Sequence, residues 1–418
     1  MKNKQASSGL HVDPIDGLRP DFIMGADISM LRQIEISGGK YYVNGVENDC
    51  LTILRDHGVS WIRLRVWNDP TDERGQALGG GNNDLARTVE MAARARAMGF
   101  RFLLDFHYSD WWADPGKQYK PKAWAGLDFE QLKQAVYDYT AEVIHTLAAA
   151  GAMPDMVQIG NEVNGGMIWP DGKTWSEGSE QIGGYDGFAG LLKQGIQAVR
   201  DRDPDRDKPD KRARIVIHLA DGGDNDLYRR VFDNLTERNL DFDVVGLSYY
   251  SYWHGTLDRL KDNMADVSTR YHKDLLIAET AYAFTLENSG GLANIFGEKE
   301  QAIGGYEATV QGQATAVRDV MAAVAQVPDG RGLGVFYWEP DWFPVEGAGW
   351  KTGEGDNWAN QAMFDAEGHA LPSINVFHLV RPETRAAALS LNCHSERSEE
   401  SLLGQERPFA SAPETGRH

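Results

Sequence analysis

The stretch Met156-Val157-Gln158-Ile159-Gly160-Asn161-Glu162-Val163-Asn164 joins a short apolar run to a polar end. Its first four residues favour β-structure, so we predict a buried strand there. An amide, a carboxylate and a second amide then follow where the strand should give way to a loop. Polar groups gathered at one end of a buried strand indicate a functional site, and Glu162 supplies the carboxylate.

A second stretch repeats this design later in the chain. Leu275-Leu276-Ile277-Ala278-Glu279-Thr280-Ala281-Tyr282 is again an apolar run that ends in a carboxylate, Glu279. Two glutamates at strand ends indicate a carboxylate pair. Such a pair is what acid/base and nucleophilic work on a glycosidic bond requires.

Strand-like runs alternate with helical stretches on both sides of these two segments, a pattern typical of βα units around a parallel sheet. The predicted strands are 22–29, 61–67, 101–109, 156–162, 214–220, 244–253, 275–282 and 334–342. The predicted helices include 84–98, 128–150, 185–202, 226–238, 256–271 and 311–325, several of which open with a capping Asp or Thr. Eight such units predict an α/β fold of the (β/α)₈ TIM-barrel type.

A doubly wound open sheet is the structural alternative. It would usually carry a glycine-rich phosphate turn after an early strand, whereas Met30-Leu31-Arg32-Gln33 follows the first strand here. Long loops also follow several predicted strands, at 111–127, 163–184, 283–308 and 343–363. They would build up the carboxyl-terminal face, where barrel enzymes carry their active sites.

The domain organisation predicted from this pattern is simple. Residues 1–20 are expected to be a flexible N-terminal segment, and residues 21–385 a single catalytic barrel. Residues 386–418 are rich in Ser, Glu, Arg and Pro with few large apolar side chains, so we expect a disordered C-terminal tail.

Charge and composition narrow the possible partners. The chain has 42 Lys and Arg against 62 Asp and Glu, a net charge of −20, which disfavours nucleic acids and anionic membranes as partners. A neutral substrate fits better. No apolar run reaches the length of a membrane span, and no signal peptide is visible between Met1 and Asp21. Cys50 and Cys393 form no disulfide framework or metal-binding motif.

Polar and aromatic side chains accumulate at the ends of the predicted strands. They are Arg63, Arg65, Asp105, His107, His218, Tyr249, Tyr250, Trp253, His254, Trp338, Glu339 and Asp341. A lone glutamate at a strand end is more often a solvated or ion-paired group than a catalyst. Together they would be costly inside an apolar barrel unless they faced a shared cleft.

Hydrolysis of a glycosidic bond by two carboxyls requires that the two groups have different chemical roles. One must hold a proton for the leaving oxygen while the other is ionised and attacks the anomeric carbon. We expect Arg65 to keep the attacking carboxylate ionised, a tyrosine hydroxyl to orient it, and Asn161 to hydrogen-bond a sugar hydroxyl. This assigns Glu279 as nucleophile and Glu162 as acid/base, with the carboxyls about 5 Å apart.

Five motifs carry a resemblance to a known family. They are Gly25-Ala26-Asp27-Ile28-Ser29, Arg63-Leu64-Arg65-Val66-Trp67, the stretch 105–115 (DFHYSDWWADP), Gln158-Ile159-Gly160-Asn161-Glu162 and Trp338-Glu339-Pro340. Together they resemble the arabinogalactan endo-β-1,4-galactanases, which belong to the clan of retaining (β/α)₈ glycoside hydrolases. The likeness covers residues 22–377, the whole predicted barrel.

The resemblance implies an endo-acting hydrolase that cuts β-1,4-linked galactan of pectin side chains with retention, using Glu162 as acid/base and Glu279 as nucleophile. It implies a secreted or periplasmic protein, and we expect a monomer. The candidate substrate-binding residues are Arg65, Asp105, His107, Trp112, Asn161, His218, Tyr249, Trp253, Trp338 and Trp350. Trp61 and Trp67 are expected in the core instead.

One departure from the family concerns a metal. Bacterial relatives often carry calcium in the loop after strand seven, held by Asp, His and Asn. The corresponding stretch here is Leu286-Glu287-Asn288-Ser289-Gly290-Gly291-Leu292-Ala293-Asn294, which offers few hard oxygen ligands. We therefore expect no cofactor, no metal at the catalytic centre and no strong calcium site near Asn288–Asn294.

Two other functions stay open at this point. Another retaining β-glycanase of the same clan, acting on mannan, xylan or cellulose, would carry the same strand-end glutamates. The second is a carbohydrate-binding barrel without activity, although such a protein would not need both an acid and a nucleophile. A phosphate-binding barrel is disfavoured, because the loop after the eighth strand is acidic and rich in Trp.

Overall fold

The computed structural model describes residues 9–382 and contains a closed barrel of eight parallel strands. Each strand pairs with its neighbours in chain order, and the barrel closes where Asp27 of the first strand pairs with Trp338 of the last. The barrel strands are β1 (Ile23–Asp27), β4 (Trp61–Val66), β5 (Arg101–Phe106), β6 (Met156–Ile159), β9 (Arg214–Leu219), β10 (Val244–Ser248), β11 (Asp274–Thr280) and β12 (Gly332–Trp338). The predicted (β/α)₈ barrel is confirmed.

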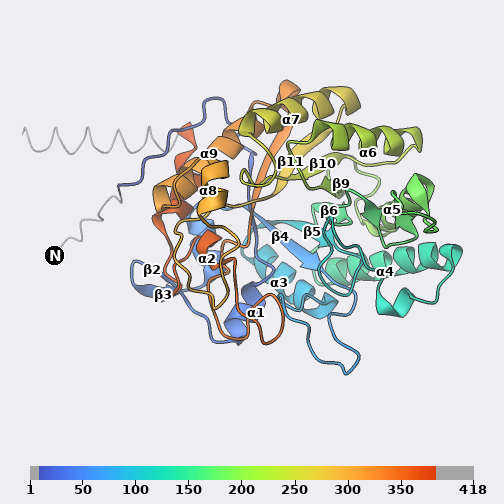
Figure 1. Ribbon diagram of the computed structural model, residues 1–418, viewed down its shortest axis with the longest axis horizontal. Coiled ribbons are helices and arrows are strands. Elements are labelled where there is room, and N and C mark those ends of the chain that lie inside the picture. Colours follow the sequence, from blue (N-terminus) through green and yellow to red (C-terminus); the bar gives the residue numbers. More distant parts are fainter. Residues whose placement is uncertain (1–8, 383–418) are drawn as a thin grey trace, which may run out of the picture.

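Helices surround the strands, as Figure 1 shows. They are α1 (Leu31–Ile36), α2 (Cys50–Asp56), α3 (Leu85–Ala97), α4 (Phe129–Ala149), α5 (Gly184–Arg202), α6 (Asn225–Glu237), α7 (Leu257–Tyr271), α8 (Glu298–Gly304), α9 (Val310–Ala325) and α10 (Val376–Leu379). Short hairpins join β2 (Tyr41–Val43) to β3 (Val46–Asn48) and β7 (Gly166–Met167) to β8 (Gly172–Lys173).

Side-chain caps explain where several of these helices begin. The side chains of Asp84, Asp128 and Thr256 each accept a hydrogen bond from the main-chain N–H three residues later. These bonds satisfy N–H groups that have no partner within the helix. Helix α6 is capped by Asp224, two residues before the predicted start at Asp226.

The inside of the barrel has an apolar half and a polar half. Its apolar half is a cluster of Ile23, Trp61, Leu103, Met156, Val216, Val244, Leu276, Ala278, Leu333 and Phe336. Further along the strands, the same inward face carries Arg63, Asp105, Gln158 and His218 two residues after members of this cluster, and Asp27 four residues after Ile23, because side chains on one face of a strand recur every second residue. The apolar half therefore supports the polar half from below. Trp61 and Trp67 are buried, as expected.

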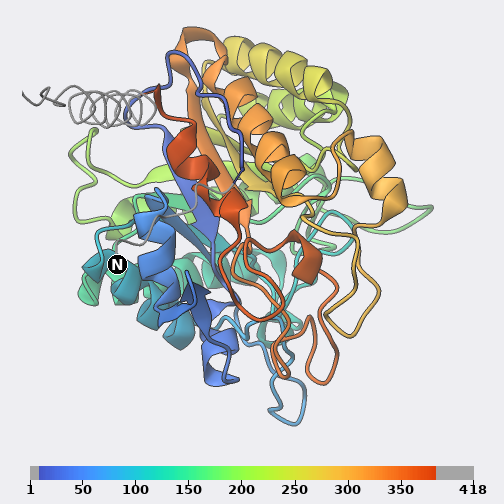
Figure 2. The same ribbon diagram turned by 90° about the vertical axis from the view of Figure 1, so that its left-hand side faces the viewer.

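Loops at the carboxyl ends of the strands build one face of the molecule. The loop after β4 is bound to the loop after β12, since Gly80 N–H donates to the Gly349 carbonyl (3.0 Å) and Thr352 N–H donates to the Leu78 carbonyl (2.8 Å). Figure 2 shows these two loops, light blue and orange-red, extending together beyond the barrel. The first and last thirds of the chain thus share this face.

The N-terminal segment differs from the flexible segment expected over residues 1–20, as far as it is described. Ile15 and Leu18 are buried in the main core cluster, and Ile15 N–H donates to the Val380 carbonyl at 2.9 Å. These contacts fix residues 15–18 against the barrel. The expected disordered tail, 386–418, lies outside the described residues. Between residues 9 and 382, no helix is long and apolar enough to cross a membrane.

Gly25 is expected to be indispensable to the packing inside the barrel. A Cβ placed there would lie 2.3 Å from Cδ1 of Phe336, so even alanine must displace a buried ring. We expect Gly25→Ala to lower the free energy of unfolding by about 1–3 kcal/mol, measured by chemical denaturation. Gly126→Ala, where a Cβ meets nothing within 4 Å, is the matched control. Equal stabilities of the two variants would contradict this packing argument.

Candidate active site

The two glutamates reach the same cleft through two local departures from regular strand geometry. After β6, Gly160 and Glu162 have φ values of +85° and +47°, in the left-handed region that non-glycine residues seldom adopt. On β11 the pairing with β10 passes from Leu247–Ile277 to Ser248–Glu279, so Ala278 forms a one-residue bulge. A bulge re-aims the side chain that follows it, which here is Glu279.

The carboxyls of Glu162 and Glu279 lie close together. An oxygen of one lies within 4.8 Å of an oxygen of the other. This agrees with the expected separation of about 5 Å, and it is well below the roughly 6.5–9.5 Å that leaves room for an attacking water.

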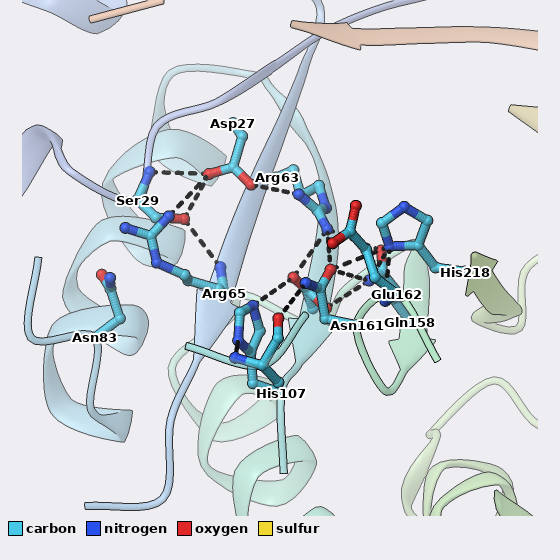
Figure 3. Close-up of polar contacts among 12 residues, drawn as sticks. Asp27, Ser29, Arg63, Arg65, Asn83, His107, Gln158, Asn161, Glu162 and His218 are labelled. Carbon is cyan, nitrogen blue, oxygen red and sulfur yellow. Dashed lines mark hydrogen bonds and ion pairs between the residues drawn. The ribbon is translucent and has the colours of Figure 1, made fainter. Parts of the chain in front are cut away.

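A buried guanidinium, that of Arg63, lies at the centre of the polar half of the barrel. Its Nη1 donates to Asp27 Oδ2 (2.8 Å) and to Glu279 Oε1 (2.9 Å). Its Nη2 donates to Asp105 Oδ2 (2.9 Å) and to the amide oxygens of Gln158 (3.2 Å) and Asn161 (3.0 Å). Figure 3 shows Asp27, Gln158 and Asn161 around Arg63.

The expectation that Arg65 holds the attacking carboxylate is wrong. Arg63 and Arg65 both point inward, but Arg65 lies two residues further along β4 and binds Glu339 and the Gly80 carbonyl. Its guanidinium also lies 4.3 Å from the ring centre of Trp112. Arg65 therefore supports the wall of the cleft, while Arg63 binds Glu279.

A tyrosine hydroxyl does orient Glu279, as expected, and it is that of Tyr250, whereas the substrate-binding candidate Tyr249 does not reach the cleft. The hydroxyl of Tyr250 donates to Glu279 Oε2 at 3.0 Å. Tyr249 is buried outside the cleft, where its hydroxyl donates to the Gly255 carbonyl at 3.0 Å. Tyr249 is thus corrected to Tyr250 as the cleft tyrosine.

The two glutamates differ in their electrostatic surroundings. Burial raises the pKa of Glu279 to about 7, and the positive charge of Arg63 limits that rise. Burial, followed by the charge of Glu279, raises the pKa of Glu162 well above its ordinary value, and a 2.6 Å hydrogen bond from Ser248 opposes this only in part. Arg63 and Tyr250 both donate to Glu279, whereas among the described residues only Ser248 donates to the Glu162 carboxyl, so these surroundings favour the charge on Glu279 and the proton on Glu162.

The remaining polar candidates divide between the cleft wall and the layer beneath it. Asp105, His107 and Asn161 line the cleft, where His107 Nε2 lies 3.2 Å from Asp105 Oδ2. His218 is fully buried and does not line the cleft. It lies beside Glu162 and Gln158, as Figure 3 shows, and the main-chain N–H of Glu162 lies 3.4 Å from its Nδ1.

The cleft has a volume of about 490 Å³ and aromatic walls. The candidates Trp112, Trp253, Trp338 and Trp350 all line it, together with Trp111, Tyr250 and Trp358. The rings of Trp338 and Trp350 are stacked with centres 5.8 Å apart, whereas the side chain of Trp253 is half exposed at the rim. Aromatic faces of this kind suit the apolar faces of sugar rings.

Several residues of the site were not among the substrate-binding candidates, although Arg63 and Tyr250 were noted among the polar side chains at strand ends. Arg63, Tyr250 and Trp358 line the cleft, and Ser248 contacts Glu162 from below. The sequence did contain a signal for Arg63 and Tyr250, because each lies two residues after an inward-facing residue of the same strand. No sequence signal distinguished Trp358, which lies in a long loop.

Two places bear on the metal expectations made from the sequence, and the absence of a metal stays a prediction. A nitrogen of His218 lies within 4.8 Å of oxygens of Glu162 and Glu279, but Arg63, Tyr250 and Ser248 already bind the two carboxyls. In the stretch 286–294, the side-chain amide of Asn294 donates to the Glu287 carbonyl at 2.9 Å, and Asn288 Oδ1 accepts from the main-chain N–H of Asn294. Two oxygens of this loop thus already accept hydrogen bonds within it.

Comparison with known proteins places this site in a family. The profile described as "Glycosyl hydrolase family 53" matches residues 23–377. An endo-β-1,4-galactanase of Bacillus subtilis is 38% identical over 88% of this chain and 88% of its own length. Among solved structures, a catalytic domain from Ignisphaera aggregans is 50% identical with a TM-score of 0.83, over 89% of this chain and 99% of its own. One of two fungal β-1,4-galactanases is 30% identical with a TM-score of 0.71, over 85% and 98%. The chain therefore belongs to glycosyl hydrolase family 53.

Proposed function

We propose that this protein is an endo-acting, retaining glycoside hydrolase that cleaves β-1,4-galactosidic bonds in galactan and type I arabinogalactan. The observation that carries the proposal is the close carboxyl pair, Glu162 and Glu279, whose members have different hydrogen-bond donors. A separation this short suits direct attack by one carboxylate on the sugar.

Glu279 has the contacts expected of a nucleophile. Arg63 binds one of its oxygens and Tyr250 the other, so the carboxylate is held in one orientation. Both partners donate hydrogen bonds, which favours the ionised form. A fixed, ionised carboxylate next to the anomeric carbon lowers the entropic cost of attack.

Glu162 has the properties expected of the acid/base. Its raised pKa keeps a proton available for the leaving oxygen. In the first step Glu279 attacks the anomeric carbon as Glu162 protonates the departing oxygen, giving a glycosyl–enzyme ester. The ionised Glu162 then takes a proton from water, which attacks the same carbon, releases Glu279 and restores both groups.

The choice of galactan rests on the relatives whose names give an activity. The Bacillus subtilis relative is an endo-β-1,4-galactanase, and a Cellvibrio japonicus relative, 35% identical over 85% of this chain, is an arabinogalactan endo-β-1,4-galactanase. The net charge of −20 and the aromatic cleft are consistent with a neutral sugar polymer. A polysaccharide does not cross membranes unaided, so we infer that the enzyme acts outside the cytoplasm.

A substrate panel tests the proposed specificity. We expect release of reducing ends from galactan and arabinogalactan, with at most trace release from mannan, xylan or cellulose. Endo-cleavage should lower the viscosity of galactan before monosaccharide appears. A Glu279→Ala preparation controls for contaminating hydrolases. Faster release from xylan or mannan than from galactan would refute the substrate assignment.

The two tyrosines at the end of β10 offer a matched test of how Glu279 is held. Tyr250→Phe removes a hydrogen bond to a charged carboxylate, so kcat/KM on galactan should fall about 10- to 100-fold. Tyr249→Phe removes a hydroxyl that binds the Gly255 carbonyl, and kcat/KM should stay within about threefold of the parent. Equal effects of the two changes would argue against a role for Tyr250.

Azide separates the roles of the two glutamates. In Glu279→Ala, azide should attack from the vacated side and give a glycosyl azide of inverted configuration. Glu162→Ala should retain far more activity on a dinitrophenyl galactoside than on galactan, because that leaving group needs no proton and general acid help is worth about 10²–10⁴-fold. With the dinitrophenyl substrate, azide should replace water in the second step catalysed by Glu162→Ala and give a glycosyl azide of retained configuration.

The control for this experiment is Glu367→Ala, which alters an exposed glutamate and should leave the activity unchanged. Product configurations are read by NMR. Azide products of the opposite configurations would reverse the two roles, and full activity of both variants on galactan would remove the pair from the mechanism.

A further inference from the structure

Ser248 lies between the proposed acid and a buried histidine. It ends β10 and is fully buried. Its hydroxyl lies 2.6 Å from Glu162 Oε1 and 2.9 Å from His218 Nε2. A hydroxyl has one hydrogen to donate, so it can donate to Glu162 or to His218, but not to both. The protonation of His218 therefore decides which way the bond points.

Gln158 decides the protonation of His218. Arg63 Nη2 donates to Gln158 Oε1 at 3.2 Å, which fixes the orientation of the amide. Gln158 Nε2 then donates one hydrogen to Asp105 Oδ1 at 2.6 Å, and it lies 2.9 Å from His218 Nδ1. The main-chain N–H of Glu162 also points at this nitrogen, at 3.4 Å. Two donors face Nδ1, so Nδ1 accepts and the ring hydrogen is on Nε2.

One contact favours the opposite tautomer. Asn161 Oδ1 lies 3.1 Å from His218 Nδ1 and would accept a hydrogen placed there. However, this oxygen already accepts from the charged guanidinium of Arg63 at 3.0 Å. A hydrogen on Nδ1 would also oppose the N–H groups of Gln158 and Glu162. Burial, followed by the charge of Arg63, holds the pKa of His218 well below its ordinary value, so the ring is neutral.

We propose that the chain Gln158–His218–Ser248 fixes the exchangeable proton of Glu162 on Oε2, the oxygen that reacts with the substrate. His218 Nε2–H donates to Ser248, and the hydroxyl of Ser248 must therefore donate to Glu162 Oε1. Among residues 9–382, none donates a hydrogen bond to Oε2 of this glutamate, which lines the cleft. Gln158, His218 and Ser248 are positioning residues for the acid.

This inference rests on the proposed function of Glu162 as acid/base. In the first step, the proton leaves Oε2 for the departing oxygen while Oε1 keeps its hydrogen bond from Ser248. In the second step, Oε2 takes a proton from the attacking water. The same oxygen therefore serves both steps, and Glu162 need not rotate between them.

Other charged groups also act on Glu162 and must be kept constant in any test. Glu279 on β11 and Asp114 in the loop after β5 raise its pKa, whereas Arg63 on β4 and the hydroxyl of Ser248 lower it. Replacing Ser248 by alanine leaves Glu279, Asp114 and Arg63 in place. A change in the titration of Glu162 in this variant then reports on the hydroxyl.

The direction of a pH shift tests the proposal. If Ser248 donates to Glu162, it stabilises the carboxylate, so Ser248→Ala should move the alkaline limb of kcat/KM on galactan to higher pH. At the optimum, kcat/KM should fall about 10- to 100-fold on galactan but less than about threefold on a dinitrophenyl galactoside. Ser248→Thr, which keeps a hydroxyl, should restore the pH limb. A shift to lower pH, or no shift, would overturn the proposal.

Two further measurements keep the result interpretable. Ser268→Ala removes another fully buried hydroxyl, one without a hydrogen-bond partner in the described part of the chain, and controls for general loss of stability. In protein labelled with ¹⁵N-histidine, the His218 signals should show hydrogen on Nε2 and none on Nδ1. Hydrogen on Nδ1 would overturn the proton placement alone. Equal losses on galactan and the dinitrophenyl substrate would overturn the acid role of Glu162 and the placement with it.

Discussion

The guanidinium of Arg63, buried inside the barrel and shared among three carboxylates, is the interaction on which the site depends. Asp27, Asp105 and Glu279 come from β1, β5 and β11, so one side chain joins strands from three parts of the barrel. Removing one partner of a buried ion pair costs about 3–5 kcal/mol, because an uncompensated charge is left behind. Arg63 is therefore both a structural centre and the group that fixes Glu279.

Buried negative charge exceeds buried positive charge around this centre. Arg63 and Arg65 face six carboxyls, those of Asp27, Asp105, Glu162, Glu279, Glu339 and Asp341. Two cations cannot keep six carboxylates ionised in a low-dielectric interior, so some must hold protons. Burial raises the pKa of Glu339 to about 8 and that of Asp341 well above its ordinary value. Carboxyls thus outnumber cations throughout the barrel mouth, and the raised pKa of Glu162 is part of this general pattern.

Much of this arrangement could be predicted from the sequence, because alternation along a strand is a local property. All eight barrel strands and the two strand-end glutamates were found from apolar runs and their polar ends, which are equally local. The same alternation, extended from Val244 through Gly246 and Ser248, would have selected Tyr250 in place of Tyr249. Alternation could not show how deep Arg63 and Arg65 lie in the barrel, because that depth depends on the stagger between neighbouring strands. The bulge at Ala278 likewise appears only in the pairing of β10 with β11.

The contact between the two ends of the described chain has a practical consequence. Ile15 is hydrogen-bonded to Val380, and Arg381 donates to the Phe22 carbonyl, just before β1 begins. Both ends therefore meet at the amino-terminal rim of the barrel, and the cleft opens at the opposite rim. An enzyme attached to a bead, a cell surface or a partner domain through either end would present its cleft away from the support, open to an incoming polymer.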